Sequence, residues 1–297
     1  MQSSLKTKII LDTDIGSDID DTYALCYLLN EANVDLLGVC TVTGQAYDRA
    51  LLCKILIEIA NRDVPVYVGD EKPLSDQDIL QPICHMKDII DHFHISQSVE
   101  DEDASDYLVR MANEYPNEIT LVGVAPFTNI AKAVLKDAAF ASKIKRLVIM
   151  GGKTDHSDSL KKVLDWNMLC DVEAGRIILD ANFNDLTIFP CELTNKVFTP
   201  SAFLHEHICG KYARAIKEMG ENWFNRDHEV FHYHDPMACY YCVHPEIFKL
   251  RSGRMKMVNN DKGSYTIWHD DDNGKHHLAY DIDKDKFLND LYQIINN

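Results

Sequence analysis

The sequence predicts an α/β fold: one domain with a mostly parallel central sheet flanked by helices, and a helical elaboration in the C-terminal third. Short runs rich in Val, Ile and Leu alternate with longer helical patterns over roughly the first two hundred residues, as in βαβ units. Hydrophobic residues make up 46% and charged residues 26% of the 297 residues, a globular composition. Neither an internal repeat nor a Gly/Ser linker divides the chain, so we treat residues 1–297 as a single domain.

The first part of the chain alternates strand and helix. A short apolar run at 8–11 predicts a buried strand, and 20–30 predicts a helix because its apolar residues recur on one helical face. The run at 35–43 is rich in apolar and β-branched residues, which predicts a second strand. The stretch 46–62 has a helical period and predicts a long helix, and 65–68 predicts a short strand that begins with proline.

The middle of the chain continues this alternation. The expected elements are helices at 106–114, 129–136 and 172–180 and strands at 119–124, 146–150 and 186–189. Strands joined by helices in this way run parallel, so their carboxyl ends meet at one edge of the sheet, where ligands bind in such folds. Polar or glycine-rich residues follow several of the predicted strands, as a site built from strand ends requires.

After residue 200 the pattern loosens into the helical elaboration. The expected elements are helices at 202–207, at 212–219 and after Pro236, strands at 265–268 and 277–280, and a closing helix at 283–295. The stretch before Pro236 is rich in histidine and has no periodicity, so we expect it to be irregular.

Charge and composition limit the possible partners. The chain has 30 Lys and Arg against 47 Asp and Glu, a formal net charge of −17, which disfavours a nucleic acid or an anionic membrane as partner. No apolar run approaches the ~18 residues that span a bilayer, and the start lacks the apolar region of a signal peptide. The nine cysteines lie mostly in apolar stretches, which is typical of reduced core residues. We therefore expect a cytoplasmic protein.

The densest chemical signal is the segment 12–21, with five carboxylates in ten residues. An N-cap and a favourable interaction with the helix dipole explain one or two of them. Asp12 and Asp14, however, follow a buried strand, where crowded carboxylates repel one another unless a cation lies between them. Oxygen ligands without nearby Cys or His indicate Ca²⁺ or Mg²⁺, and a crowded, irregular ligand set favours Ca²⁺.

A second signal is His234-Asp235-Pro236 at the start of an apolar helix. Taken alone, Asp followed by Pro is an ordinary helix start. A metal site that lacks ligands from the first loop nevertheless needs a carboxylate from elsewhere in the chain. A histidine beside that carboxylate is then a candidate proton donor.

The segment 12–21, followed by Thr22-Tyr23-Ala24-Leu25, resembles the aspartate fingerprint of the nucleoside hydrolases, the inosine–uridine-preferring nucleoside N-ribohydrolases. Further segments resemble the family's in order and rough spacing. These segments are 38–44, 65–69, 72–74, 124–131, 148–152, 165–167, 171–174 and 234–236. Each segment is a weak signal, whereas the ordered set is specific.

The resemblance implies a metal site. Asp14 resembles the carboxylate that binds the metal and accepts a proton from its water, and Asp21 and Asp235 resemble further ligands. Val124 lies where the family uses a backbone carbonyl as a ligand. Asp12 is expected to support the same cluster.

The resemblance also implies a substrate site. Asp20, Asn167 and Asp165 lie where the family binds the ribose hydroxyls, and Met150 where it contacts the ring. Gln45 stands in place of an asparagine that usually follows the second strand.

The leaving base needs a proton donor, for which His234 is the candidate. The alternatives in the same stretch are Tyr233, His232 and His228.

Several departures from the family concern the substrate half. Ile15 replaces a proline, and Ser17-Asp18-Ile19 replaces a single residue, so Asp18 is an alternative to Asp20 or Asp21. Asp165 replaces a longer glutamate, the family's Gly-Asn is missing from 158–162, and its His-Gly is not recognisable in 81–94. The metal half is intact.

The residues and the resemblance together imply Ca²⁺-dependent hydrolysis of the N-glycosidic bond of ribonucleosides, which releases ribose and a free purine or pyrimidine base for salvage. Two alternatives stay open: a metal-dependent hydrolase of another ribosyl compound, and a non-catalytic relative that binds ribose or calcium. The resemblance also implies a homo-oligomer, a dimer or a tetramer.

Overall fold

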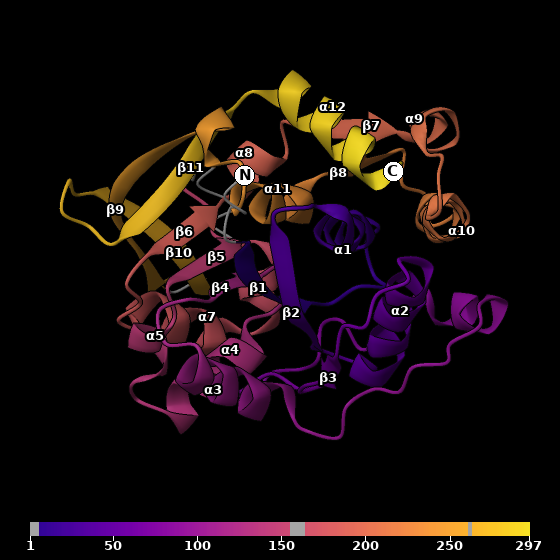
Figure 1. Cartoon of the computed structure of the whole chain (residues 1–297). Helices are drawn as coiled ribbons and strands as arrows, with labels where there is room; N and C mark the ends of the chain where they lie inside the picture. The colour runs from indigo at the N-terminus through magenta and orange to yellow at the C-terminus, as the bar shows by residue number, and fades with distance from the viewer. Residues whose placement is uncertain (1–5, 155–163, 261–262) are drawn as a thin grey trace, which may run out of the picture.

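One central sheet organises the fold (Figure 1). In the computed structural model, which describes residues 6–154, 164–260 and 263–297, nine strands form this sheet. In spatial order they are β10 (Gly263–Asp270), β9 (Phe248–Asn260), β11 (His276–Ile282), β6 (Leu186–Phe189), β5 (Arg146–Met150), β4 (Thr120–Gly123), β1 (Thr7–Thr13), β2 (Val34–Thr41) and β3 (Val66–Val68). Neighbours from β11 to β3 are parallel, and β9 and β10 are antiparallel additions at one edge. The predicted α/β fold is confirmed.

Helices cover both faces of this sheet (Figure 1). The longer ones are α1 (Asp20–Asn30), α2 (Ala46–Ile59), α3 (Ala104–Glu114), α4 (Thr128–Lys136), α7 (Val172–Asp180), α10 (Ala213–Phe224), α11 (His234–Tyr241) and α12 (Lys284–Ile295). The shorter ones are η1 (Lys87–His92), α5 (Phe140–Lys143), α6 (Trp166–Cys170), α8 (Cys191–Thr194), α9 (Ser201–His207) and η2 (Pro245–Ile247). A separate two-stranded sheet pairs β7 (Phe198–Pro200) with β8 (Val230–His232).

Alternate residues of the central strands point into two different cores. In β1, Ile9 and Leu11 pack with the helices α1, α2 and α11, whereas Ile10 packs with α3, α4 and α7. In β5, Val148 and Ile149 divide between the two cores in the same way. A parallel sheet buried on both faces explains why these strands appear in the sequence as continuous apolar runs.

The order of the strands determines where a ligand binds. Strand β1 pairs with β2 on one side and with β4 on the other, so the chain direction across the sheet reverses between β1 and β4. Ligands of open α/β sheets bind outside the carboxyl ends of the strands at such a reversal. Asp12 and Thr13 end β1, and Val124 directly follows β4.

Local backbone conformation explains where the observed elements differ from the predicted ones. Strand β2 ends at Thr41, two residues earlier than predicted, and Thr43 has a left-handed φ of 66°. Helix α2 ends at Ile59 instead of residue 62, and Asn61 has a φ of 52°. Helix α11 begins before Pro236, since a proline is tolerated in the first turn.

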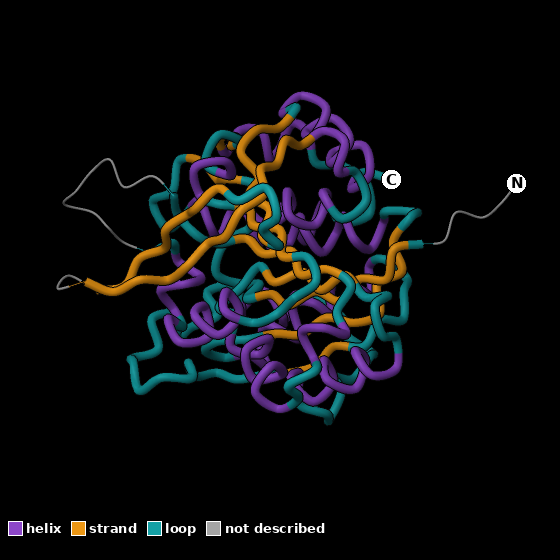
Figure 2. Tube along the Cα trace, turned by 90° about the vertical axis from the view of Figure 1, so that its left-hand side faces the viewer, coloured by secondary structure: helices purple, strands orange, loops and turns teal. Residues whose placement is uncertain are grey.

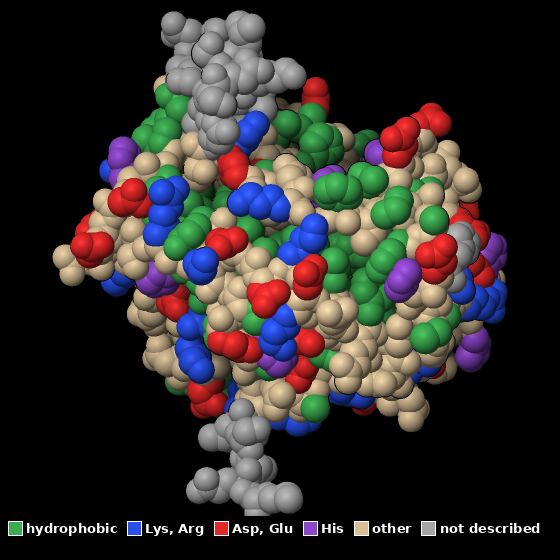
Figure 3. Space-filling model, turned by 90° about the horizontal axis from the view of Figure 1, so that it is seen from above, with side chains coloured by type: hydrophobic (Ala, Val, Ile, Leu, Met, Phe, Trp, Pro, Cys, Tyr) green, Lys and Arg blue, Asp and Glu red, His purple; other side chains and the backbone are tan. Residues whose placement is uncertain are grey.

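The sequence analysis missed strand β9 and the small β7–β8 sheet, of which β8 lies where an irregular stretch was expected. In β9 the buried Met255 lies between the exposed Arg254 and Lys256, the alternation of a half-exposed strand. The β9–β10 hairpin extends outward from the body of the molecule (Figure 2). On the face seen in Figure 3, acidic and basic side chains are interspersed. No helix within the described ranges is long and apolar enough to cross a membrane.

Candidate functional site

A cavity of about 590 Å³ opens at the carboxyl ends of β1, β4 and β5. It brings together eight of the predicted site residues: Asp14, Asp20, Asp21, Val124, Met150, Asn167, His234 and Asp235. They come from segments up to more than two hundred positions apart in the sequence, and the fold brings them to one cavity beside the reversal of the strand order.

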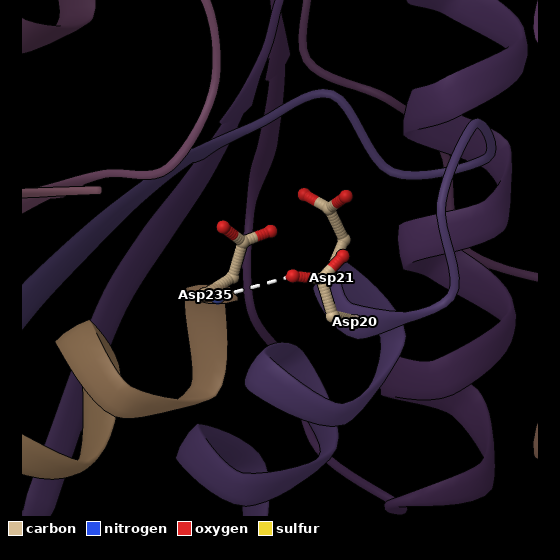
Figure 4. Close-up of side chains that lie close together, drawn as sticks. All are labelled: Asp20, Asp21 and Asp235. Atoms are coloured by element: carbon tan, nitrogen blue, oxygen red, sulfur yellow. Dashed lines mark hydrogen bonds between the residues drawn. The ribbon is translucent and has the colours of Figure 1, made fainter. Parts of the chain in front are cut away.

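Three buried carboxylates form the centre of this site (Figure 4). Asp20 and Asp21 open α1, Asp235 lies in the first turn of α11, and one oxygen of each lies within 4.8 Å of the others. The backbone N–H of Asp235 donates to Oδ2 of Asp20 at 3.1 Å, which joins the two helix starts. The hydroxyl of Thr13 at the end of β1 donates to Oδ1 of Asp21.

This cluster fits a divalent cation. Burial raises the pKa values of Asp20, Asp21 and Asp235 well above the ordinary range, and the charges of neighbouring carboxylates raise each of these pKa values further. Charged carboxylates in such a place are stable only when a positive charge compensates them. All of these donors are oxygen atoms, the ligands that Ca²⁺ and Mg²⁺ prefer.

The carbonyl of Val124 faces the same region. Its oxygen accepts a hydrogen bond from Nδ2 of Asn167 at 3.1 Å, and the same nitrogen donates to the carbonyl of Met150 at 3.1 Å. Asn167 therefore links the ends of β4 and β5 to α6, and all three residues line the cavity.

Asp14 lies beside the cluster and is held by the side chain of Gln81. Nε2 of Gln81 donates to Oδ2 of Asp14 at 2.7 Å, and the indole Nε1–H of Trp166 donates to Oε1 of Gln81 at 2.6 Å. Because the indole is a donor only, it fixes which end of the amide faces Asp14. Burial raises the pKa of Asp14, and the positive charge of Arg49 opposes that rise.

Arg49 of α2 is fully buried and organises the acidic loop. Its guanidinium donates to the carbonyls of Asp14 and Ile15 and to Oγ of Ser17, and its Nε donates to the carbonyl of Gly44 at 3.0 Å. The sequence analysis missed this role. An arginine among the apolar residues of a predicted helix could have indicated a buried guanidinium that binds polar groups.

Asp12 lies under the loop and does not line the cavity. Its Oδ1 accepts from Nδ2 of Asn129 at 2.7 Å, and burial raises its pKa to about 8. Asn129 also donates to the carbonyl of Thr41, so it ties β1 to β2 below the site. Asp18, the residue that the longer loop adds, lines the cavity, and burial raises its pKa to about 7.

Two predicted substrate ligands, Asp165 and Gln45, lie outside the cavity lining. The carboxylate of Asp165 accepts from the backbone N–H of Gly152 at 2.7 Å and caps α6 through the N–H of Met168. Oε1 of Gln45 accepts from the N–H of Cys84 at 2.8 Å. Both side chains thus bind backbone groups and stabilise the surrounding loops.

Among the candidate proton donors, His234 lines the cavity. Its Nδ1 forms a hydrogen bond with Oγ1 of Thr194 at 2.7 Å, and burial lowers its pKa to about 3. Of the alternatives, His228 also lines the cavity, whereas His232 and Tyr233 do not. Tyr233 is fully buried.

Sequence reasoning also missed Gln81 and His85, which line the cavity from a segment without periodicity. Trp166, the first residue of α6, lines the rim of the cavity with 52% of its surface exposed. Helix α6 places its side chain outward, where it holds Gln81.

Comparison with known proteins identifies relatives over most of the chain. Residues 9–289 match the model of a family described as inosine-uridine preferring nucleoside hydrolase. Uridine nucleosidase 1 of Arabidopsis thaliana is 28% identical over 264 residues, which cover 84% of this chain and 78% of the relative. The pyrimidine-specific ribonucleoside hydrolase RihB of Escherichia coli O1:K1 is 31% identical over 201 residues, which cover 66% of this chain and 63% of the relative.

Among solved structures, a purine-preferring ribonucleoside hydrolase from Gardnerella vaginalis has a TM-score of 0.80. The likeness covers 97% of this chain and 98% of that one at 22% identity, so it concerns the fold alone.

The acidic cluster predicts that Ca²⁺ stabilises the protein. A cation that binds only the folded state raises the melting temperature as its concentration rises, and chelation reverses the effect. Asp235→Asn should abolish this response. In a chelator the same variant should melt higher than the wild type by roughly 2–4 °C, the shift for about 1 kcal/mol, because one repulsive charge is removed.

Thermal unfolding in chelator and in Ca²⁺ measures both effects. The matched control is Asp285→Asn, which changes an exposed aspartate in the first turn of α12. If the melting temperature of the wild type does not change with the concentration of Ca²⁺, the predicted metal site is wrong.

Proposed function

The chain belongs to the inosine-uridine preferring nucleoside hydrolase family, and we propose that it hydrolyses the N-glycosidic bond of ribonucleosides with the help of Ca²⁺. The products are ribose and a free base. The observation that carries this proposal is the buried cluster of Asp20, Asp21 and Asp235, which lines one cavity together with Asp14.

In this proposal Asp14, Asp21, Asp235 and the carbonyl of Val124 hold the cation. When bound, Ca²⁺ supplies the positive charge that makes a coordinated water more acidic and orients it. The oxygen donors and the buried negative charge support this assignment. Asp18, which lines the same cavity, is the alternative ligand.

Asp14 is the proposed proton acceptor. The hydrogen bond from Gln81 holds one carboxylate oxygen and thereby orients the group. A positioned general base contributes about 10²–10⁴-fold to a rate, and preorganisation by Gln81 and Arg49 reduces the movement that this step requires.

The remaining buried groups suit the ribose. The transition state of this cleavage is oxocarbenium-like, with positive charge on the sugar, so nearby carboxylates stabilise it. We assign Asp20 and Asn167 to the ribose hydroxyls and Met150 to the ring, because all three line the cavity beside the acidic cluster. Asp165 and Gln45, predicted for the same role, lie outside the cavity lining and accept hydrogen bonds from backbone N–H groups, so we do not assign them to the ribose.

His234 is the proposed proton donor to the leaving base. It lines the cavity next to Asp235, and Thr194 orients its ring. Since burial keeps the ring neutral at neutral pH, a bound substrate has to raise its pKa before it can donate. His228 is the alternative.

The names of the relatives, a uridine nucleosidase and a pyrimidine-specific hydrolase, support a pyrimidine ribonucleoside as one substrate. We propose activity on purine ribonucleosides as well, and a role in base salvage. By resemblance to the family we further propose a cytoplasmic homo-oligomer, a dimer or a tetramer.

A second candidate is a hydrolase of another ribosyl compound. Two observations favour it: Asp165 and Gln45 lie outside the cavity lining, and the longer loop adds Asp18 to it. A panel of nucleosides and other ribosides, assayed for release of reducing sugar, separates the two functions.

Asp14→Asn should bind ribose normally but lower kcat by about 10²–10⁴-fold or more, because it removes the proton acceptor together with a charge near the metal. Steady-state kinetics with saturating Ca²⁺ measures the loss. Near-normal turnover would exclude Asp14 as the base and make Asp18 the next candidate.

His234→Ala should slow cleavage of inosine far more than cleavage of a nitrophenyl riboside, whose leaving group needs no proton. The two rates are compared in the same preparation of enzyme. Equal losses on both substrates would mean that His234 positions the site and does not donate the proton.

The enzyme should cleave inosine and uridine, and their 2′-deoxy analogues should be much poorer substrates. A site built to bind a hydroxyl leaves buried polar groups unpaired when that hydroxyl is absent, which costs a factor of about 10⁴ or more at well-built sites. Values of kcat/KM for matched ribo- and deoxyribonucleosides test this, and comparable values would refute it.

A further inference from the structure

The cavity has two chemically different ends. The carboxylates of Asp14, Asp20, Asp21 and Asp235 are at most 6% exposed and form the closed end. The opposite part is lined by exposed side chains, which include His85 and His228. A nucleoside whose ribose lies at the carboxylates therefore extends its base toward this open end.

Arg226 is the one arginine or lysine among the described residues that line the cavity. It follows α10 and lies between Trp223 and His228 in sequence. Its Nη2 donates to the carbonyl of Ser17 in the acidic loop, and its guanidinium lies 5.0 Å from the centre of the Trp223 ring. Arg226 is thus held against the acidic loop on one side and an aromatic ring on the other.

The charge of Arg226 is incompletely compensated. A backbone carbonyl and an aromatic ring do not neutralise a guanidinium, and Asp18 attracts it only through space. Its Nε is buried and has no acceptor within the described part of the chain. A buried guanidinium donor without an acceptor is costly, which indicates that a ligand supplies one.

The same charge dominates the open end of the cavity. The pKa values of His85 and His228 are lowered first by burial and then by the positive charge of Arg226. Both rings are therefore neutral at neutral pH, and Arg226 remains the cation there.

We propose that Arg226 is a further catalytic residue, whose guanidinium stabilises the negative charge on the departing base. This inference rests on the proposed hydrolysis of ribonucleosides. When the N-glycosidic bond breaks, its electron pair goes to the base, whose ring spreads the charge onto its exocyclic oxygen. Water adds to the anomeric carbon and gives its proton to Asp14, and the base, on which negative charge builds up as the bond breaks, receives its proton from His234. A fixed positive charge near that oxygen lowers the barrier because the charge exists only as the bond breaks.

The kinetic test compares Arg226→Gln with Arg226→Lys. Loss of the charge in Arg226→Gln should lower kcat for uridine by about 10²-fold, the usual effect of removing one group that faces developing charge. A nitrophenyl riboside should lose far less, since a nitrophenolate disperses its own charge. Arg226→Lys should recover much of the uridine rate. Equal losses on both substrates, or equal rates of Arg226→Gln and Arg226→Lys, would show that Arg226 has a structural role and overturn the inference.

The matched control is Arg214→Gln. Arg214 lies on α10, donates to the carbonyl of His92 at 3.0 Å and lies 4.6 Å from the centre of the Phe93 ring. Like Arg226 it contacts a backbone carbonyl and an aromatic ring, but its Nε donates to Glu218 at 2.8 Å and it does not line the cavity. Its substitution should leave both substrates unaffected.

A binding test separates this inference from the proposed function. Uracil is neutral at neutral pH, whereas 5-nitrouracil is ionised, and calorimetry in the presence of Ca²⁺ and ribose measures both affinities. The wild type should prefer the anion by about tenfold or more, and Arg226→Gln should lose that preference while Arg226→Lys keeps it. If the wild type cleaves no nucleoside, the proposed function fails. The binding measurement then still tests whether Arg226 recognises an anionic base. A preference for the anion that survives in Arg226→Gln would overturn the inference.

Discussion

Buried negative charge is the constraint on which the rest of the structure depends. Asp14, Asp20, Asp21 and Asp235 lie with little exposure at the carboxyl edge of a parallel sheet, and burial raises the pKa of each. Such a cluster is costly unless a cation and well-placed donors compensate it. Arg49 supplies a fixed positive charge from beneath the loop. The cluster lies where the strand order reverses, which is the place where ligands bind in open α/β sheets. Its unfavourable buried charge is therefore located at the binding site.

The arrangement of charge in the cavity corresponds to the flow of charge in the proposed reaction. In that reaction positive charge develops on the sugar and negative charge on the group that leaves it. Carboxylates at one end of the cavity stabilise the first charge, and a guanidinium at the other end stabilises the second. The closed end is built from strand ends and helix starts, whereas the open end is built from loops and from α10. In the proposed reaction the sheet therefore holds the residues that act on the ribose, and the loops would contact the base, the part of the substrate that varies.

Sequence reasoning predicted the residues whose roles depend on regular structure. Asp14, Asp21 and Asp235 were predicted from the acidic segment after the first strand and from the resemblance to the family, and the structure puts them in one cavity. Gln81 and Arg226 were missed because they lie in segments without periodicity, where only tertiary contacts fix a side chain. Asp165 and Gln45 fall at family positions, yet their side chains bind backbone N–H groups, which a linear pattern does not reveal. The charges alternating along β9 were a readable signal that was overlooked.

The link from Trp166 through Gln81 to Asp14 gives the protein an optical property. Gln81 uses its amide oxygen for the indole and its amide nitrogen for the carboxylate, so Asp14 cannot reorient without disturbing Trp166. Half of the Trp166 surface faces solvent at the rim of the cavity, and indole emission responds to its hydrogen bond and its hydration. A movement of the buried carboxylate is therefore expected to change the emission of Trp166, which would make this side chain a built-in reporter of occupancy.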